Sequence, residues 1–253
     1  MNMNITSHAR LRRFLSIIVI GVIIMNAFAL LTGCSVFEAD TAKMVKKKLN
    51  EKYGLNFVVT AMGDRINTGS ATLYCHPEDN ENIRFSAVYN YSTQSITDDY
   101  LPRKYAVELE NEIAGFSESL GVPFAAFVVF DDAKYDDITN VSDLEDFVKQ
   151  SGTSKLFIRL ALNADQAASH QKAKAILDSL VQLSSNHESV PLLVPVFMYH
   201  EDDYNNCVGE LRERTEANNL WFESFNSFEK ITIKVQDKTI IQNEDLFIQT
   251  VKG

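Results

Sequence analysis

The chain has 253 residues, and its hydrophobic content of 45% with only 10 glycines and 5 prolines is typical of an ordered globular protein. Residues 1–33 hold three arginines and no acidic residue, so the remainder carries 21 basic and 34 acidic side chains, a formal charge of −13. This excess of negative charge repels a phosphate backbone and argues against nucleic acid as a partner.

The chain opens with the three parts of a secretory signal. Arginines precede a largely apolar run over residues 14–31, and the small residue Gly33 stands directly before Cys34. The quartet Leu31-Thr32-Gly33-Cys34 resembles the lipobox of bacterial lipoproteins. That resemblance implies cleavage between Gly33 and Cys34 and a membrane lipid attached through the Cys34 thiol, with residues 1–33 as the signal peptide.

The alternative for the same segment is an uncleaved membrane anchor, because this largely apolar run of 18 residues approaches the roughly 20 that cross a bilayer. In both cases the arginines stay on the cytoplasmic side and the rest of the chain is exported. We therefore expect a protein held at the cell membrane on its extracytoplasmic face, with residues 34–40 as a tether.

A basic helix is predicted directly after the tether. Over residues 41–53, Val45, Leu49 and Tyr53 fall on one side at helical spacing, and lysines fall on the opposite side. Lysines close to a lipid anchor are attracted to anionic headgroups. We expect such contacts from four lysines: Lys43, Lys46, Lys47 and Lys48. The alternative is that they form the solvent-exposed face of an ordinary helix.

The predicted fold class is α+β. The first lobe, over residues 41–121, contains the basic helix, three strands of an antiparallel sheet and a helix over 102–120. Residues 122–253 form a mixed α/β lobe, either separate or continuous with the first. The motifs Tyr53-Gly54-x-x-Phe57 and Asp98-Asp99-Tyr100, together with Pro77, loosely resemble uncharacterised lipoproteins of Gram-positive bacteria, and this resemblance supplies no catalytic residues.

Two continuous apolar runs mark the second lobe. Residues 124–130 and 192–199 predict strands that are covered on both faces and lie centrally, although Pro195 indicates a bulge or a sheet edge. A strand over 155–162 and a helix over 165–183 precede the second run, and this order predicts a parallel crossover. Further predictions are a capping box at Ser142-x-x-Glu145, a helix over 204–218 and a hairpin at Asp237-Lys238.

Acidic residues follow both apolar strands. Asp131 and Asp132 come directly after the first run, and His200, Glu201 and Asp202 after the second. If the two strands are parallel neighbours, these side chains meet at one edge of the sheet, where open α/β sheets bind ligands. Their oxygen atoms suit Ca²⁺, Mg²⁺ or a basic ligand. The alternative is that they are solvent-exposed side chains of ordinary loops.

Two cysteines remain beside Cys34. Cys75 and Cys207 either form a disulfide, which an exported protein permits, or are buried thiols. An aromatic stretch over residues 221–228 contains Trp221, Phe222, Phe225 and Phe228, and it predicts either core packing or a recognition surface.

One motif with the spacing of a common catalytic site is present, Ser169-x-x-Lys172, but its companion motifs are not in place, so we assign no catalytic residue and no cofactor. The sequence favours a non-enzymatic lipoprotein that binds a protein or another ligand of the cell envelope. Two alternatives remain open: an envelope hydrolase that uses a divalent metal at the acidic residues, and the solute receptor of a transporter.

Overall fold

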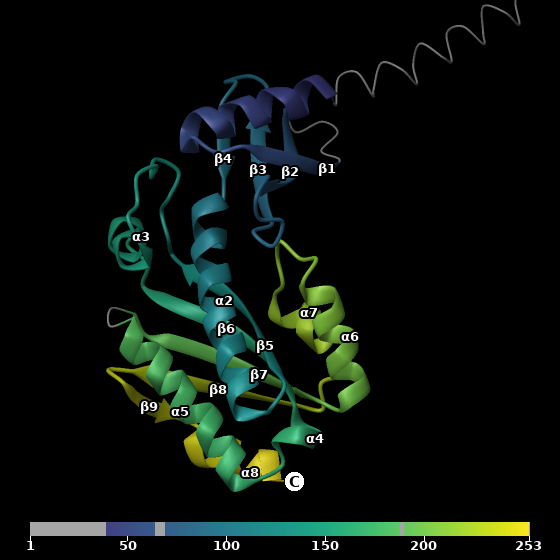
Figure 1. Cartoon of the computed structure of the whole chain (residues 1–253), viewed down its shortest axis with the longest axis vertical. Coiled ribbons are helices and arrows are strands. Elements are labelled where there is room, and N and C mark those ends of the chain that lie inside the picture. Colours follow the sequence, from purple (N-terminus) through teal and green to yellow (C-terminus); the bar gives the residue numbers. More distant parts are fainter. Residues whose placement is uncertain (1–38, 64–68, 188–189, 253) are drawn as a thin grey trace, which may run out of the picture.

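The computed structural model describes residues 39–63, 69–187 and 190–252, so the signal-like segment with Cys34 lies outside the described residues. Within these ranges the chain is an α+β protein built on two sheets, as predicted: an antiparallel sheet first, then a mixed one (Figure 1). No helix of the described ranges is both long and apolar enough to cross a bilayer.

The first, small sheet has four strands in the order β1-β2-β3-β4, and every neighbouring pair is antiparallel. Three of the strands were predicted; β4 was not, because three residues are too few to show an alternation. The strands are β1 (Phe57–Gly63), β2 (Ser70–Pro77), β3 (Phe85–Asn90) and β4 (Ile96–Asp98).

The N-terminal helix, described over residues 39–53, covers one face of the small sheet (Figure 1). Val45 and Leu49 are fully buried, whereas Lys43 and Lys47 are exposed on the opposite side, as their spacing predicts. The apolar stripe of this helix therefore completes the core of the small sheet and leaves its basic side to solvent.

A polar cluster joins this helix to the end of the sheet. The side chain of Asp98 has no solvent exposure, and its Oδ2 atom lies 2.9 Å from Lys52 Nζ. Its Oδ1 atom accepts hydrogen bonds from the Tyr53 hydroxyl at 2.7 Å and the Tyr100 amide at 3.2 Å. Burial and the nearby Asp98 carboxylate both raise the pKa of Tyr53, which keeps that hydroxyl protonated as a donor.

The second, large sheet has the order β5-β6-β7-β8-β9. Only β6 and β7 run parallel, and two helices connect them, which confirms the predicted crossover. Its strands are β5 (Phe124–Asp131), β6 (Lys155–Asn163), β7 (Leu192–Tyr199), β8 (Glu229–Gln236) and β9 (Thr239–Gln242).

Helices cover both faces of the large sheet. On one face they share a buried cluster that continues into the small sheet, so the two sheets have a common core. Those helices are α2 (Tyr100–Leu120), α3 (Leu144–Ser151), α4 (Ala164–Ala167), α5 (His170–Asn186) and α8 (Glu244–Lys252). The opposite face packs in a second buried cluster against α6 (Glu201–Leu211) and α7 (Asn219–Glu223).

The strand over 124–131 lies at an edge of the large sheet, and the prediction of a central position is wrong. Its apolar run reflects coverage by α2 rather than a strand on each side. Glu110 Oε1 of α2 accepts a hydrogen bond from the Val128 amide at 2.8 Å, and Arg103 Nη1 donates to the Val128 carbonyl at 3.3 Å. Side chains of α2 thus bond backbone groups on the open edge of β5.

Pro195 lies in the interior strand β7, without the predicted bulge or edge position. Its registered pair is Thr232 of the antiparallel neighbour β8. On the parallel side, the pairs with β6 stop at Leu193 and resume at Val196. The amide that proline lacks therefore falls in a local gap of one ladder, and the register does not shift.

Several element ends differ from the predictions. The N-cap of α3 is Asp143, whose carboxylate accepts from the Asp146 amide at 2.9 Å, so the predicted capping box at Ser142 is one residue early. The predicted helix over 204–218 is α6, which ends at Leu211. Asp237 and Lys238 both have positive φ between β8 and β9, which confirms the hairpin.

Candidate functional site

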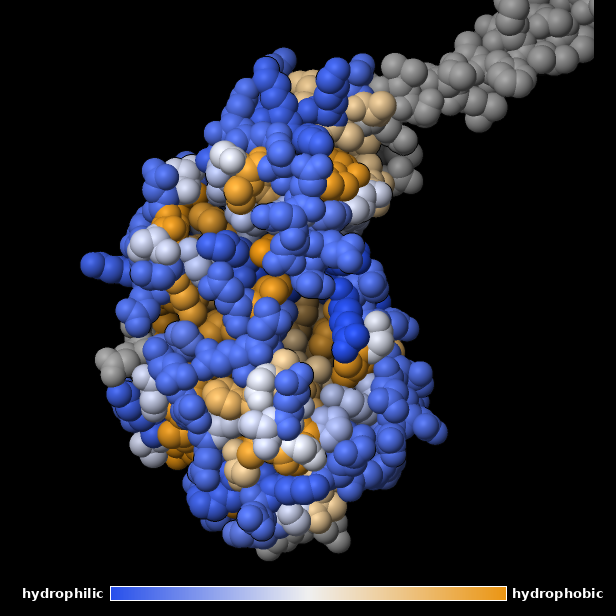
Figure 2. Space-filling view, in the orientation of Figure 1, coloured by the Kyte–Doolittle hydropathy of each residue, from blue (hydrophilic) through white to orange (hydrophobic). Residues whose placement is uncertain are grey.

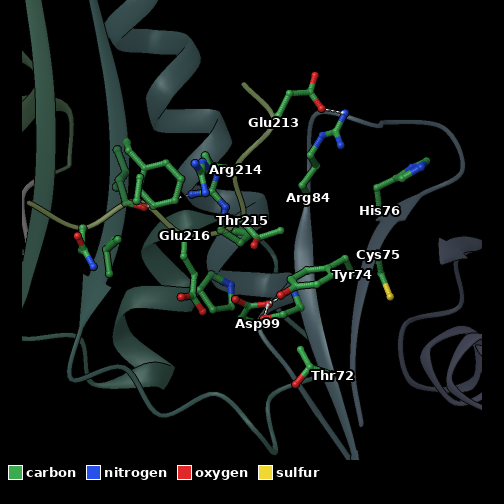
Figure 3. A pocket seen from close by; sticks show the side chains of 18 of the residues that line it. Thr72, Tyr74, Cys75, His76, Arg84, Asp99, Glu213, Arg214, Thr215 and Glu216 are labelled. Carbon is green, nitrogen blue, oxygen red and sulfur yellow. Dashed lines mark hydrogen bonds and ion pairs between the residues drawn. The ribbon is translucent and has the colours of Figure 1, made fainter. Parts of the chain in front are cut away.

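A cleft of about 980 Å³ lies between the small sheet and the large one. One wall is the outer face of β2 and β3. The other is formed by the edge strand β5, the start of α2 and the segment from the end of α6 to α7. Figure 3 shows Thr72, Tyr74 and Arg84 along the small sheet, with Arg214 and Thr215 on the opposite side.

The alternation of β2 builds the first wall. Thr72, Tyr74 and His76 line the cleft at every second position, while Cys75 between them is 2% exposed. In Figure 3 the ring of Tyr74 points into the cleft toward Asp99, and the Cys75 thiol points away. Burial raises the pKa of Cys75 to about 12, so this thiol is protonated at neutral pH and is not a nucleophile.

Four arginines line the cleft of this acidic protein, and three of them pair with glutamates of the chain. These pairs differ in burial, since Arg103 is 7% exposed whereas Arg214 is on the surface. The three N–O distances are 2.7 Å for Arg84–Glu213, 3.1 Å for Arg103–Glu110 and 3.5 Å for Arg214–Glu210.

The Arg103–Glu110 pair closes the back of the cleft. Both terminal nitrogens of Arg103 donate to the Glu110 carboxylate, and the guanidinium lies 4.4 Å from the centroid of the Phe127 ring. Burial raises the pKa of Glu110, and the charge and hydrogen bonds of Arg103 oppose that shift. Arg103 Nε is buried without a hydrogen-bond partner in the described part of the chain.

Arg159 is the fourth arginine, and it differs from the others. It lies half-buried in the middle of β6, directly opposite Phe127 of β5. Its Nε donates to the Asn219 side chain at 2.9 Å, and no carboxylate of the described residues lies within 4 Å of its guanidinium. Burial lowers its pKa, because partial removal from water disfavours the charged form.

Asp99 stands between the two walls, directly before α2. Its side chain does not cap the helix. Instead, its Oδ1 accepts from the Ser86 amide at 2.6 Å and the Ser86 hydroxyl at 3.2 Å. Burial raises the pKa of Asp99 to about 6, against the lowering by these bonds and by Arg103. This carboxyl group therefore titrates within the cleft just below neutral pH.

The aromatic stretch divides between buried and more exposed positions. Phe222 is fully buried and stacks on Phe197 with ring centroids 4.9 Å apart, so it belongs to the core. Trp221 is half-buried and lines the cleft, where the Arg214 guanidinium lies 5.1 Å from its ring centroid. Phe228 is 48% exposed and stacks on His200. Trp221 is the single tryptophan of the chain and hence a fluorescent reporter of the cleft.

The acidic residues after the two apolar strands do not share an edge, because β5 runs antiparallel to β6 and β7 runs parallel to it. Asp131 pairs with Lys155 at the start of β6, and Tyr199 pairs with Asn163 at its end. These ends are separated by the nine residues of β6, or roughly 26 Å at about 3.3 Å per residue. The predicted meeting of the clusters is therefore wrong.

Each cluster makes local contacts instead. Lys155 Nζ lies 2.7 Å from the Asp131 carboxylate, and Asp132 accepts a hydrogen bond from Ser154. At the other end, Asp165 bonds the His200 ring at 3.0 Å and the Glu201 amide at 3.1 Å. Glu201 and Asp202 lie in the first turn of α6, where acidic side chains favour a helix N-terminus. The described residues contain no group of three or more metal-ligating side chains.

Cys75 and Cys207 are free thiols and form no disulfide. Cys75 belongs to the core that the two sheets share, whereas Cys207 lies in the separate cluster under α6 and α7. Burial also raises the pKa of Cys207, to about 11. Both cysteines are therefore small apolar core residues, which is the second of the two predicted alternatives.

The comparisons with known proteins give one structural likeness. No family model matches the chain, and no curated protein matches it. A crystal structure of a DUF5037 family protein from Ruminococcus gnavus is similar, with a TM-score of 0.61 and 14% identity over 84% of this chain and 98% of that one. This likeness supports the α+β fold described above and carries no residue-level function.

Sequence reasoning missed the cleft and its arginines. Arg159 sits inside a strand, where a single charged residue in an apolar run gives no sign of its surroundings. Its neighbour Asn219 is 60 positions away in the chain. The one available signal was Arg159 itself, since an arginine within the run over residues 155–162 needs a polar partner or a solvent channel.

Proposed function

We propose that this chain is a lipid-anchored binding module on the extracytoplasmic face of the cell membrane, and that its ligand binds in the cleft between the two sheets. The cleft is the observation that supports binding: at about 980 Å³ it has the size of small-molecule sites, and Trp221, Tyr74 and arginines line it. The anchor is supported by the pattern of residues 31–34, with lipid attached through Cys34.

Binding rather than catalysis is favoured by the chemistry of the cleft. Its thiol, Cys75, is buried with a pKa of about 12, and three of its arginines are held by glutamates. The viewed face of the molecule is largely hydrophilic, with apolar side chains in small separate groups (Figure 2). On this face, such a surface favours a ligand held in a cleft over a partner docked on a broad apolar patch.

Trp221 fluorescence tests the binding proposal directly. Fractions of an envelope extract from the native host are titrated into the full chain, and at least one fraction is expected to change the emission saturably. Val88→Phe places a larger side chain on the cleft face of β3 and should weaken that response. The matched control is Ile241→Phe on β9, where the residue is 53% exposed and lies outside the cleft.

An extract that leaves Trp221 unchanged in every fraction contradicts the binding proposal, as does an equal response from both variants. The anchor is tested separately, by mass spectrometry of the protein from native membranes. A diacylglyceryl group on Cys34 as the first residue is the expected result. An intact leader with an unmodified Cys34 thiol contradicts this part of the proposal.

The N-terminal helix supplies a second membrane contact in this proposal. Lys43, Lys46 and Lys47 are exposed, Lys48 is half-exposed, and Met44 between them is 39% exposed. Each lysine near an anionic surface contributes about 1 kcal/mol of attraction, which salt weakens. Binding to vesicles with anionic lipid should therefore fall when the three exposed lysines are changed to glutamine, and vesicles of neutral lipid should show no such difference.

A further inference from the structure

Arg159 stands out among the charged groups of the cleft because the fold leaves its charge without a counter-ion. The described chain is rich in carboxylates, and every other cleft arginine has one within 3.5 Å. Glu213, Glu216 and Asp99 line the same cleft, yet none of them forms an ion pair with Arg159.

The surroundings of Arg159 are partly apolar. Phe127, its register partner on β5, is 3% exposed, and the ring centroid of Phe157 lies 5.6 Å from the guanidinium. A charge that is partly removed from water without a counter-charge destabilises a fold. The position nevertheless opens onto a cleft large enough for a ligand, so a counter-ion can come from outside the protein.

The geometry of the guanidinium indicates what kind of counter-ion fits. Nε is occupied by the side chain of Asn219, which fixes the orientation of the group. The two terminal nitrogens have no hydrogen-bond partner among the described residues and present a fork of N–H donors. Such a fork matches two oxygen atoms of one carboxylate or phosphate group.

We infer that Arg159 is the anion-binding residue of the cleft, and that the ligand carries a carboxylate or phosphate group which its two terminal nitrogens hold. This inference rests on the proposed binding function and names the chemistry of its ligand. Arg214, whose guanidinium lies 5.1 Å from the Trp221 ring centroid in the same cleft, is paired with Glu210, so Arg159 supplies the unpaired charge and Trp221 reports on it from the same cleft.

The test uses three small probes with the full chain in detergent at constant ionic strength. Acetate, methyl phosphate and dimethyl phosphate represent a carboxylate, a phosphomonoester and a phosphodiester. At least one of them should change Trp221 emission saturably and raise the melting temperature, because a ligand of the native state stabilises it by mass action. The probe with the strongest effect identifies the source of the anion.

Three variants identify the residue responsible. Arg159→Met keeps the length of the side chain without its charge and should weaken binding about ten- to a hundredfold, the loss expected for a charge-assisted pair of hydrogen bonds. Arg159→Lys keeps the charge without the fork and should lie between. Arg212→Met is the matched control, since Arg212 is exposed and lies outside the lining of the cleft, and it should bind like the unchanged protein.

Arg159→Met should still fold, because Arg159 is half-buried and the change removes one hydrogen bond, to Asn219, together with a charge that has no counter-ion. The inference is overturned if no probe binds saturably, or if Arg159→Met binds the probes as well as the unchanged protein does. An envelope fraction that changes Trp221 emission equally in Arg159→Met and in the unchanged protein would contradict the anion assignment and would still support the proposed function. Probes that bind through Arg159 while no envelope fraction acts would support the anion site and contradict the proposed function.

Discussion

Two regions of the molecule differ in whether their buried polar atoms have hydrogen-bond partners. One is the junction beneath the N-terminal helix, and the other is the cleft on the opposite face of the small sheet. At the junction, the Asp98 carboxylate has no solvent exposure and bonds Lys52, Tyr53 and the Tyr100 amide. In the cleft, Thr72 Oγ1 and Arg103 Nε are buried without a partner. Within the described residues, these are the two buried side-chain atoms without a hydrogen bond, and both belong to residues that line the cleft.

This contrast separates buried polar groups that stabilise the fold from buried polar groups that destabilise it. A buried polar atom without a hydrogen bond costs about 1–3 kcal/mol, so a site that collects such atoms is maintained against stability. Binding sites carry such a cost, because a group already bonded within the protein is not available to a ligand. We therefore interpret the Asp98 junction as structural and the cleft wall as functional.

The largest effect is expected from Asp98→Ala. This change leaves the Lys52 ammonium without its carboxylate and removes the acceptor of Tyr53 and the Tyr100 amide. Breaking a buried pair in this way costs about 3–5 kcal/mol of unfolding free energy, which urea denaturation measures. Glu51→Ala is the control, because Glu51 lies beside Lys52 on the N-terminal helix and its pair with Lys47 is exposed and should contribute little. A small loss from Asp98→Ala would remove the distinction between the two regions.

Asp99→Asn tests the cleft side of the comparison through pH. Burial raises the folded-state pKa of Asp99 from 3.8 to about 6, so the folded protein holds this proton more tightly than the unfolded chain does. Its contribution to stability is therefore complete below about pH 4 and is lost as the pH rises through about 6. A shift of about two units corresponds to about 3 kcal/mol at most.

Asparagine keeps the oxygen that accepts from Ser86 and does not titrate. The unfolding free energy of Asp99→Asn should therefore exceed that of the unchanged protein increasingly between pH 4 and pH 7. Asp165→Asn should show the opposite sign, because hydrogen bonds from His200 and the Glu201 amide lower the pKa of Asp165. That contribution is present above the ordinary carboxyl pKa and is lost in acid. Parallel pH curves for Asp99→Asn and the unchanged protein would contradict a buried, titrating Asp99.

The sequence predicted what depends on local spacing. The stripe of Val45 and Leu49, three of the four strands of the small sheet and the turn at Asp237 follow from periodicity or from turn chemistry that a few neighbouring residues determine. The parallel crossover also followed, because a strand, a helix and a strand in succession leave few topologies.

The sequence did not predict what depends on distant partners. A strand at a sheet edge under α2 and a strand at the centre of a sheet have the same apolar sequence pattern. The run over 124–130 therefore did not reveal the position or the direction of its strand. That error produced the false meeting of Asp131 with His200. The cleft was missed for the same reason, since its walls come from β2, β5 and the segment before α7, which only the tertiary fold brings together.

The smallest expected effect comes from Thr72→Val, and it decides whether the unpartnered atoms of the cleft wall are a cost. Valine has nearly the shape of threonine, favours a strand, and removes the hydroxyl that is buried without a partner. The unfolding free energy should rise by about 1 kcal/mol, measured by urea denaturation. Thr60→Val on β1 is the control, because its hydroxyl donates to the Tyr74 carbonyl at 3.1 Å and its loss should not stabilise the fold. A destabilised Thr72→Val would mean that this hydroxyl serves the fold, and the contrast between junction and cleft would then rest on the arginines alone.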